Sequence, residues 1–175
     1  LKEGIRVWDR DINRFLTSDY VPLYNPVEEY LYDTGRWDGK DRIRALADLV
    51  PCHNPHWQEL FYRWFLGMVA HWRGMDRQHG NNTSPLLVGS QGFRKSTFCR
   101  ILLPPELRFG YTDSIDFKSR QEAERSLGRF LLVNIDEFDQ ISINQQGFLK
   151  HLLQKPVANL RKPYGSTIRE MRRYA

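Results

Sequence analysis

Cysteine is scarce in this sequence: its 175 residues include only two, Cys52 and Cys99. Two cysteines make neither a disulfide framework nor, by themselves, a tetrahedral zinc site, so we expect a reducing, cytoplasmic setting. Long apolar runs are also missing, since stretches such as residues 130–133 fall far short of the ~20 residues of a membrane span. Residues 1–15 carry charges throughout and lack the apolar centre of a secretory signal. The sequence therefore predicts neither a membrane protein nor an exported one.

The composition is that of a globular protein. Hydrophobic residues make up 41% of the chain and charged residues 27%, which argues against disorder. The length suffices for one compact domain, or for one domain with a helical extension, that buries a core of its own. Because the chain starts at Leu1 rather than methionine, we expect a piece of a longer protein.

The net charge of +5 is concentrated in residues 155–175. This segment has six basic residues and one acidic residue, whereas the rest of the chain holds twenty of each sign. The six are Lys155, Arg161, Lys162, Arg169, Arg172 and Arg173. Such a segment suits a polyanion, and each phosphate that it neutralised would make binding more salt-dependent. A solvated basic turn without a nucleic-acid partner is the alternative.

Two parts follow one another along the chain. Residues 1–79 have the pattern of helices and loops, including an apolar stripe over residues 57–72 that is typical of a buried helix. Aromatic residues in that stripe favour a packed core over a base-stacking platform. The turn-forming residues 80–84 mark the boundary. In residues 80–175, apolar runs alternate with helical patterns.

Cys52, His53 and His56 fall close together in one loop. A metal cluster is one interpretation, but no fourth ligand with suitable spacing follows. We therefore favour a polar turn.

A glycine-containing segment follows the apolar run 85–88, which we interpret as a buried strand, and precedes a helical pattern. It resembles G, four residues, G-K-[ST], whose backbone N–H groups curl around a phosphate at a helix start. The candidate nucleotide-binding residues are Gly89, Ser90, Gln91, Gly92, Phe93, Arg94, Lys95, Ser96 and Thr97. Lys95 is expected to reach the outer phosphates, and the Ser96 hydroxyl to bind Mg²⁺.

Arg94 stands where the motif has its second glycine. A glycine there takes positive backbone angles and leaves room for the phosphate. Three interpretations are open: Arg94 is helical and points outward, it adds a second cation to the phosphates, or the site binds weakly or not at all.

A second constellation lies about 40 residues further on. The apolar, strand-length run 130–135 ends at Asp136 and Glu137. In ATPases with an added catalytic glutamate, this placement puts the aspartate beside Mg²⁺ and lets the glutamate orient and deprotonate the attacking water. A plain turn together with Asp139 is the alternative.

The remaining patterns complete a βα alternation. Residues 108–111 resemble a second strand, and residues 119–127 and 144–153 resemble helices. Strand, loop and helix in this order predict an α/β fold with a parallel sheet. We expect a P-loop NTPase core over residues 80–175, with a sheet incomplete at its C-terminal end, preceded by a helical subdomain over residues 1–79.

These motifs resemble those of the virulence-associated protein E family. The similar segments are NPVEEYL, RWDGKDR, LLVGSQGFRKSTF, LLVNIDEFD and RKPYG, which together span nearly the whole chain. Members are ATPases of primase-helicase character, found on phages and mobile islands. The resemblance implies ATP-dependent, Mg²⁺-dependent work on DNA by a ring of identical subunits.

The resemblance also shows two departures. One is Arg94. The other is the end of the chain at Ala175, before the strand that carries a polar sensor residue in such ATPases. Arg161, Arg172 and Arg173 are candidates for an arginine supplied to a neighbouring subunit.

We therefore predict an ATP hydrolase of helicase type. Lys95 and Glu137 are the catalytic residues, Ser96 and Asp136 hold Mg²⁺, and single-stranded DNA binds the basic C-terminal segment. The competing hypothesis is a degenerate nucleotide-binding module that binds DNA or regulates a partner without hydrolysis. A small-molecule P-loop kinase is less favoured, because no arginine-rich lid follows the carboxylates.

Overall fold

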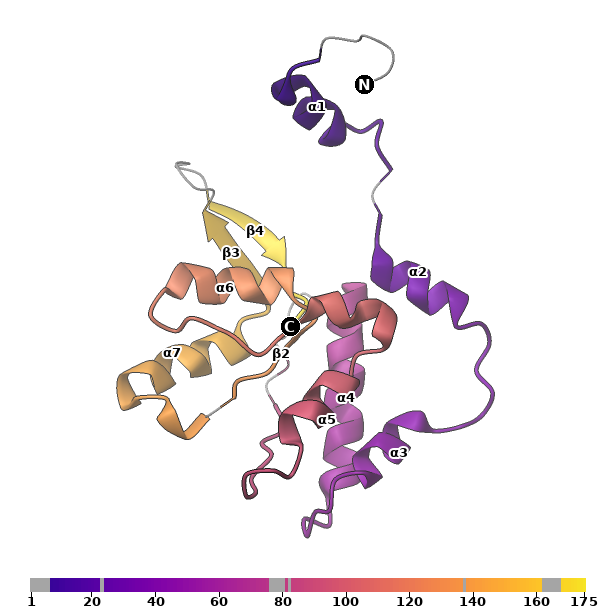
Figure 1. The fold of residues 1–175 in the computed structure, drawn as a ribbon, viewed down its shortest axis with the longest axis vertical. Helices are drawn as coiled ribbons and strands as arrows, with labels where there is room; N and C mark the ends of the chain where they lie inside the picture. The colour runs from indigo at the N-terminus through magenta and orange to yellow at the C-terminus, as the bar shows by residue number, and fades with distance from the viewer. Residues whose placement is uncertain (1–6, 23, 76–80, 82, 137, 162–167) are drawn as a thin grey trace.

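The computed structural model describes residues 7–22, 24–75, 81, 83–136, 138–161 and 168–175 (Figure 1). The elements in chain order are α1 (Asp9–Leu16), α2 (Pro26–Asp33), α3 (Arg42–Asp48), α4 (Trp57–Arg73), α5 (Lys95–Ile101), η1 (Pro105–Gly110), β1 (Tyr111–Thr112), α6 (Arg120–Arg129), β2 (Leu132–Val133), η2 (Phe138–Gln140), α7 (Ile143–Gln154), β3 (Val157–Arg161) and β4 (Ile168–Arg172). Helix α1 stands apart in Figure 1, joined to α2 by an extended segment. Among the helices described, none combines the length and apolar character needed to cross a bilayer.

Side chains at the helix starts explain where several helices begin. The Asn25 side chain accepts hydrogen bonds from the backbone N–H groups of Val27 and Glu28, and Pro26 occupies the first turn of α2. Asp41 caps α3 in the same way. Ser119 caps α6. These caps are local in sequence, which is why helix positions follow from the sequence alone.

Helix α4 is the centre of the main core. Its buried face carries Phe61, Trp64, Met68 and Trp72, so the helix predicted from the apolar stripe is confirmed. The same cluster includes Leu103 and Leu131, which come from beyond the predicted boundary at residues 80–84. The indole Nε1 of Trp72 donates a 2.8 Å hydrogen bond to the carbonyl oxygen of Leu131. Packing and this bond fix the helix against the segment that leads into β2.

Two small sheets are present in the described residues. Strands β1 and β2 pair in parallel, with Tyr111 opposite Leu132, whereas β3 and β4 form an antiparallel hairpin. The strand predicted for residues 85–88 is wrong: this segment is irregular, and the Val88 side chain is 88% exposed. An extended segment without a hydrogen-bonding neighbour is not a strand, and neither sheet includes residues 85–88.

Two consecutive arginines anchor the end of the hairpin. The Arg172 guanidinium donates hydrogen bonds to the carbonyl oxygens of His71 and Trp72 in the last turn of α4. It lies where a side chain on Gly74 would go, since a Cβ built there would be 2.8 Å from Arg172 Cζ. Gly74 has φ +65° and ends α4 in the left-handed conformation.

Arg173 does the same for α7. It is 5% exposed, and its Nη1 donates to the carbonyl oxygens of Leu152, Leu153 and Lys155 at 3.1, 3.0 and 2.6 Å. Burial lowers the pKa of Arg173 to about 10, so the guanidinium stays charged at neutral pH. A buried cation thus bonds three carbonyls at the end of α7, one of which, that of Leu152, also accepts a hydrogen bond from the Lys155 N–H.

Candidate functional site

The loop between residues 88 and 95 folds back on itself. Gly92 has φ +89°, and α5 begins at Lys95. The Lys95 ammonium donates hydrogen bonds to the carbonyl oxygens of Gly89 and Ser90, at 2.8 and 3.0 Å. Lys95 therefore spans the loop from its last residue to its first and holds its two ends together.

Arg94 takes the left-handed conformation, with φ 55° and ψ 30°. This excludes the interpretation in which Arg94 is an ordinary helical residue. The left-handed conformation costs a residue with a Cβ about 1–2 kcal/mol. The loop thus keeps a backbone path that suits glycine, although an arginine occupies the position.

A hydrogen bond joins α5 to the segment that follows β2. The Ser96 hydroxyl donates to Oδ2 of Asp136 over 2.8 Å, across 40 residues of sequence. The structure therefore brings together two of the side chains that the sequence analysis had singled out for metal binding. The second acidic candidate, Glu137, lies outside the described residues.

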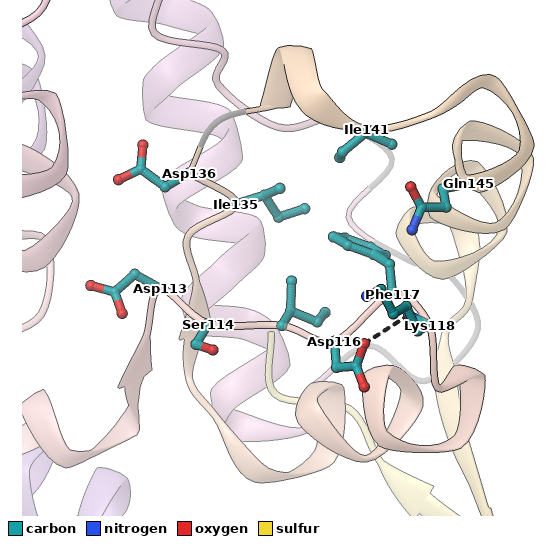
Figure 2. A pocket seen from close by; sticks show the side chains of 10 residues that line it. Asp113, Ser114, Asp116, Phe117, Lys118, Ile135, Asp136, Ile141 and Gln145 are labelled. Carbon is teal, nitrogen blue, oxygen red and sulfur yellow. Dashed lines mark hydrogen bonds between the residues drawn. The ribbon is translucent and has the colours of Figure 1, made fainter.

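Asp113 is a neighbouring carboxylate that the sequence analysis missed. It directly follows β1, whose partner strand β2 leads to Asp136, and Figure 2 shows both carboxylates on the same side of the strand ends. Arg100 of α5 forms an ion pair with Asp113 at 3.4 Å, and its guanidinium lies 5.3 Å from the centre of the Tyr111 ring. The sequence did hold this signal, because Asp113 follows the predicted strand 108–111 after one intervening residue and Asp136 comes directly after the predicted strand 130–135.

Two hollows flank Asp136. The smaller, about 340 Å³, lies between the loops that follow β1 and β2 and is drawn in Figure 2. The larger, about 900 Å³, is bounded by residues 84–89, Lys95, Ser96 and Asp136, and is otherwise walled mainly by aliphatic side chains. Of the loop candidates, Gly89, Lys95 and Ser96 line the larger hollow, so a ligand bound by Lys95 and Ser96 would lie there.

The Cys99 thiol and the Tyr111 hydroxyl stay neutral at neutral pH. Burial, and secondly the negative charge of Asp136, raise the pKa of the Cys99 thiol. Burial also raises the pKa of the Tyr111 hydroxyl. Neither side chain ionises at neutral pH, so neither adds a negative charge to the site.

The oxygens of Ser96 and Asp136 suit Mg²⁺. This ion prefers hard oxygen ligands, keeps several waters and needs only one or two protein side chains when phosphates complete its shell. A group of three or more His, Cys, Asp or Glu side chains placed for a metal does not occur among the described residues. The donors at hand therefore fit a metal that arrives with a phosphate ligand better than one held by protein alone.

Three of the six basic residues near the C-terminus are engaged within the chain. Lys155 forms a largely buried ion pair with Glu124 at 2.7 Å, while Arg172 and Arg173 hold helix ends. Arg172 and Arg173 therefore do not suit the role of an arginine offered to a neighbouring subunit. Arg161 and Arg169 belong to β3 and β4, and Lys162 lies outside the described residues.

A family model for the virulence-associated protein E-like domain matches residues 31–175. Neither a curated protein nor a solved structure matches the chain.

Proposed function

Because the chain belongs to the virulence-associated protein E-like family, we propose that it binds and hydrolyses ATP with Mg²⁺ and couples hydrolysis to work on DNA. The family is associated with primase-helicase-like proteins of phages and mobile elements. One observation carries the proposal: the 2.8 Å hydrogen bond between Ser96 and Asp136 joins the helix after the glycine-containing loop to the segment that follows β2.

The loop supplies the phosphate contacts in this proposal. Backbone N–H groups at the start of α5 face the phosphates, and the Lys95 ammonium adds a point charge. An ammonium has three donors, and two of them bond Gly89 and Ser90. The third is left for a phosphate oxygen without any change in the loop.

Asp136 and Ser96 hold Mg²⁺, directly or through its waters, once a nucleotide is bound. The metal would neutralise charge on the β- and γ-phosphates. Glu137, the next residue in the chain, is proposed to orient the attacking water and accept its proton. A ring of identical subunits acting on single-stranded DNA completes the proposal.

A module that binds nucleotide without hydrolysing it is the second candidate. Arg94 favours it, because a strained, bulky residue replaces the glycine of the motif. This candidate predicts nucleotide binding and DNA binding but no ATP-dependent strand separation.

Lys95→Ala and Glu137→Gln separate these functions. Lys95→Ala is expected to abolish ATP binding, whereas Glu137→Gln retains binding and loses turnover. Binding is measured by thermal melting, since ATP at 100 times its Kd adds about 2.7 kcal/mol of stability. Hydrolysis is measured as phosphate release with DNA present. Lys150→Ala, an exposed lysine of α7, is the matched control.

Three outcomes decide between the candidates. If both variants hydrolyse ATP at the wild-type rate, Lys95 and Glu137 are not the catalytic residues of an ATPase. Binding without hydrolysis in the wild-type protein selects the module. No melting shift at any ATP concentration contradicts both.

A further inference from the structure

Arg94 is the one non-glycine residue with positive φ in the part of the chain that the structure describes. Glycine adopts this conformation at no steric cost, so the local backbone favours glycine over arginine here. A residue held in such a conformation at a candidate site points to a role for its side chain.

The Arg94 side chain has no structural role to explain its presence. It is exposed, and it makes no hydrogen bond, ion pair or ring contact within the described residues. The neighbouring cations differ in this respect: Lys95 bonds two loop carbonyls, and Arg100 pairs with Asp113. Arg94 is thus an uncommitted positive charge next to the start of α5.

We propose that Arg94 is a specificity residue whose guanidinium binds the terminal phosphate of a nucleoside triphosphate and so favours tri- over diphosphates. This inference rests on the proposed function of the same loop. Guanidinium groups bind phosphate oxygens with two parallel hydrogen bonds, a geometry that the Lys95 ammonium does not offer. Arg94 directly precedes Lys95 and is exposed, whereas Lys95 and Ser96 are partly buried, so its guanidinium is open to solvent at the start of α5.

The proposal also accounts for the departure from the motif. A glycine at position 94 would give a relaxed loop with one cation, and an arginine gives a strained loop with two. A triphosphate carries more negative charge than a diphosphate, so the second cation acts on the difference between them. The strain remains in the free protein and is offset only when the triphosphate is bound.

Titration of Arg94→Gly and Arg94→Lys with ATP·Mg²⁺, a non-hydrolysable ATP analogue and ADP tests this inference. Arg94→Gly is expected to lower the affinity for ATP and for its analogue about tenfold or more, as for loss of a charge-assisted hydrogen bond. The affinity for ADP is expected to change less than about twofold. Arg94→Lys keeps the positive charge but not the two parallel N–H donors of a guanidinium, and is expected to recover part of the preference for triphosphates over ADP. Melting of the free variants shows that they are folded.

The outcomes separate this inference from the proposed function. Wild-type protein that binds ATP, together with Arg94→Gly that keeps the wild-type ratio of ATP to ADP affinity, overturns the inference alone. Equal weakening of ATP and ADP also overturns it, since Arg94 then acts on the whole loop. Wild-type protein that binds none of the three ligands overturns both.

Discussion

At the scale of single residues, Asp136 has the most specific surroundings. One of its carboxylate oxygens accepts a hydrogen bond from Ser96, and its charge raises the pKa of Cys99. A carboxylate in this place either stabilises α5 through its hydrogen bond with Ser96 or binds a cation. Shape and charge can be separated, because asparagine has the same shape and no charge.

Asp136→Asn therefore distinguishes the two roles. The amide oxygen of asparagine still accepts the Ser96 hydrogen bond, so we expect little change in the melting temperature of the free protein. The Mg²⁺-dependent part of ATP affinity is expected to fall about tenfold or more, since the metal loses an anionic ligand. Titrations with ATP in the presence and absence of Mg²⁺ measure it.

Asp139→Asn, at an exposed neighbouring aspartate, is the control. If the ATP affinity of Asp136→Asn depends on Mg²⁺ as strongly as that of the wild-type protein, Asp136 does not bind the metal. A large drop in the melting temperature of the free protein would assign it to stability instead.

At the scale of elements, the sequence predicted what is local and missed what is distant. Helix α4 follows from apolar spacing, whereas α6 and α7 also have a capping serine at their start, Ser119 and Ser142. Residues 85–88 have the composition of a strand, but a strand exists only with a neighbour, and composition does not supply one. The loop and Asp136 were recognisable because motif spacing carries their chemistry.

The roles of the C-terminal arginines were not predictable. Their positive charge suggested DNA or a neighbouring subunit, whereas Arg172 and Arg173 bond carbonyls about 100 and 20 residues away in sequence. Such contacts depend on where distant helix ends lie in space. Sequence counting treats a buried, engaged arginine and an exposed one alike.

Arg173→Ala tests the capping of α7. Removal of the guanidinium leaves buried carbonyls without a donor, which is expected to lower the free energy of unfolding by about 2–3 kcal/mol. For a chain of this length the melting temperature then falls by about 5–10 °C. Arg173→Met, which keeps much of the volume, is expected to recover only part of the loss. Arg14→Ala on exposed α1 is the control, and an equal effect of both alanine variants would contradict the capping role.

At the scale of the whole molecule, the net positive charge comes from residues 155–175. Lys155, Arg172 and Arg173 of segment 155–175 serve the fold, which leaves Arg161, Lys162 and Arg169 as the candidates of this segment for the proposed DNA contact. Arg161 is the last residue of β3, and Arg169 is the second residue of β4. The proposed DNA contact therefore involves fewer basic residues of this segment than the net charge of +5 implied.

The double variant Arg161→Ala, Arg169→Ala is expected to weaken binding of single-stranded DNA. Log affinity falls as log salt concentration rises, and loss of two phosphate contacts makes this slope shallower by about 1.4. Arg10→Ala, Arg14→Ala changes the net charge equally on α1 and is expected to leave that slope unchanged. Fluorescence anisotropy at several salt concentrations measures both. Equal slopes in the two variants would show that the hairpin end does not bind DNA.

The meeting of Arg172 and Gly74 links two positions far apart in the chain. A side chain at position 74 would meet the guanidinium and displace it from the α4 carbonyls, and it would also be strained by the left-handed backbone of this residue. In a collection of diverged sequences, glycine is therefore expected to persist at position 74 even where the arginine at position 172 has changed.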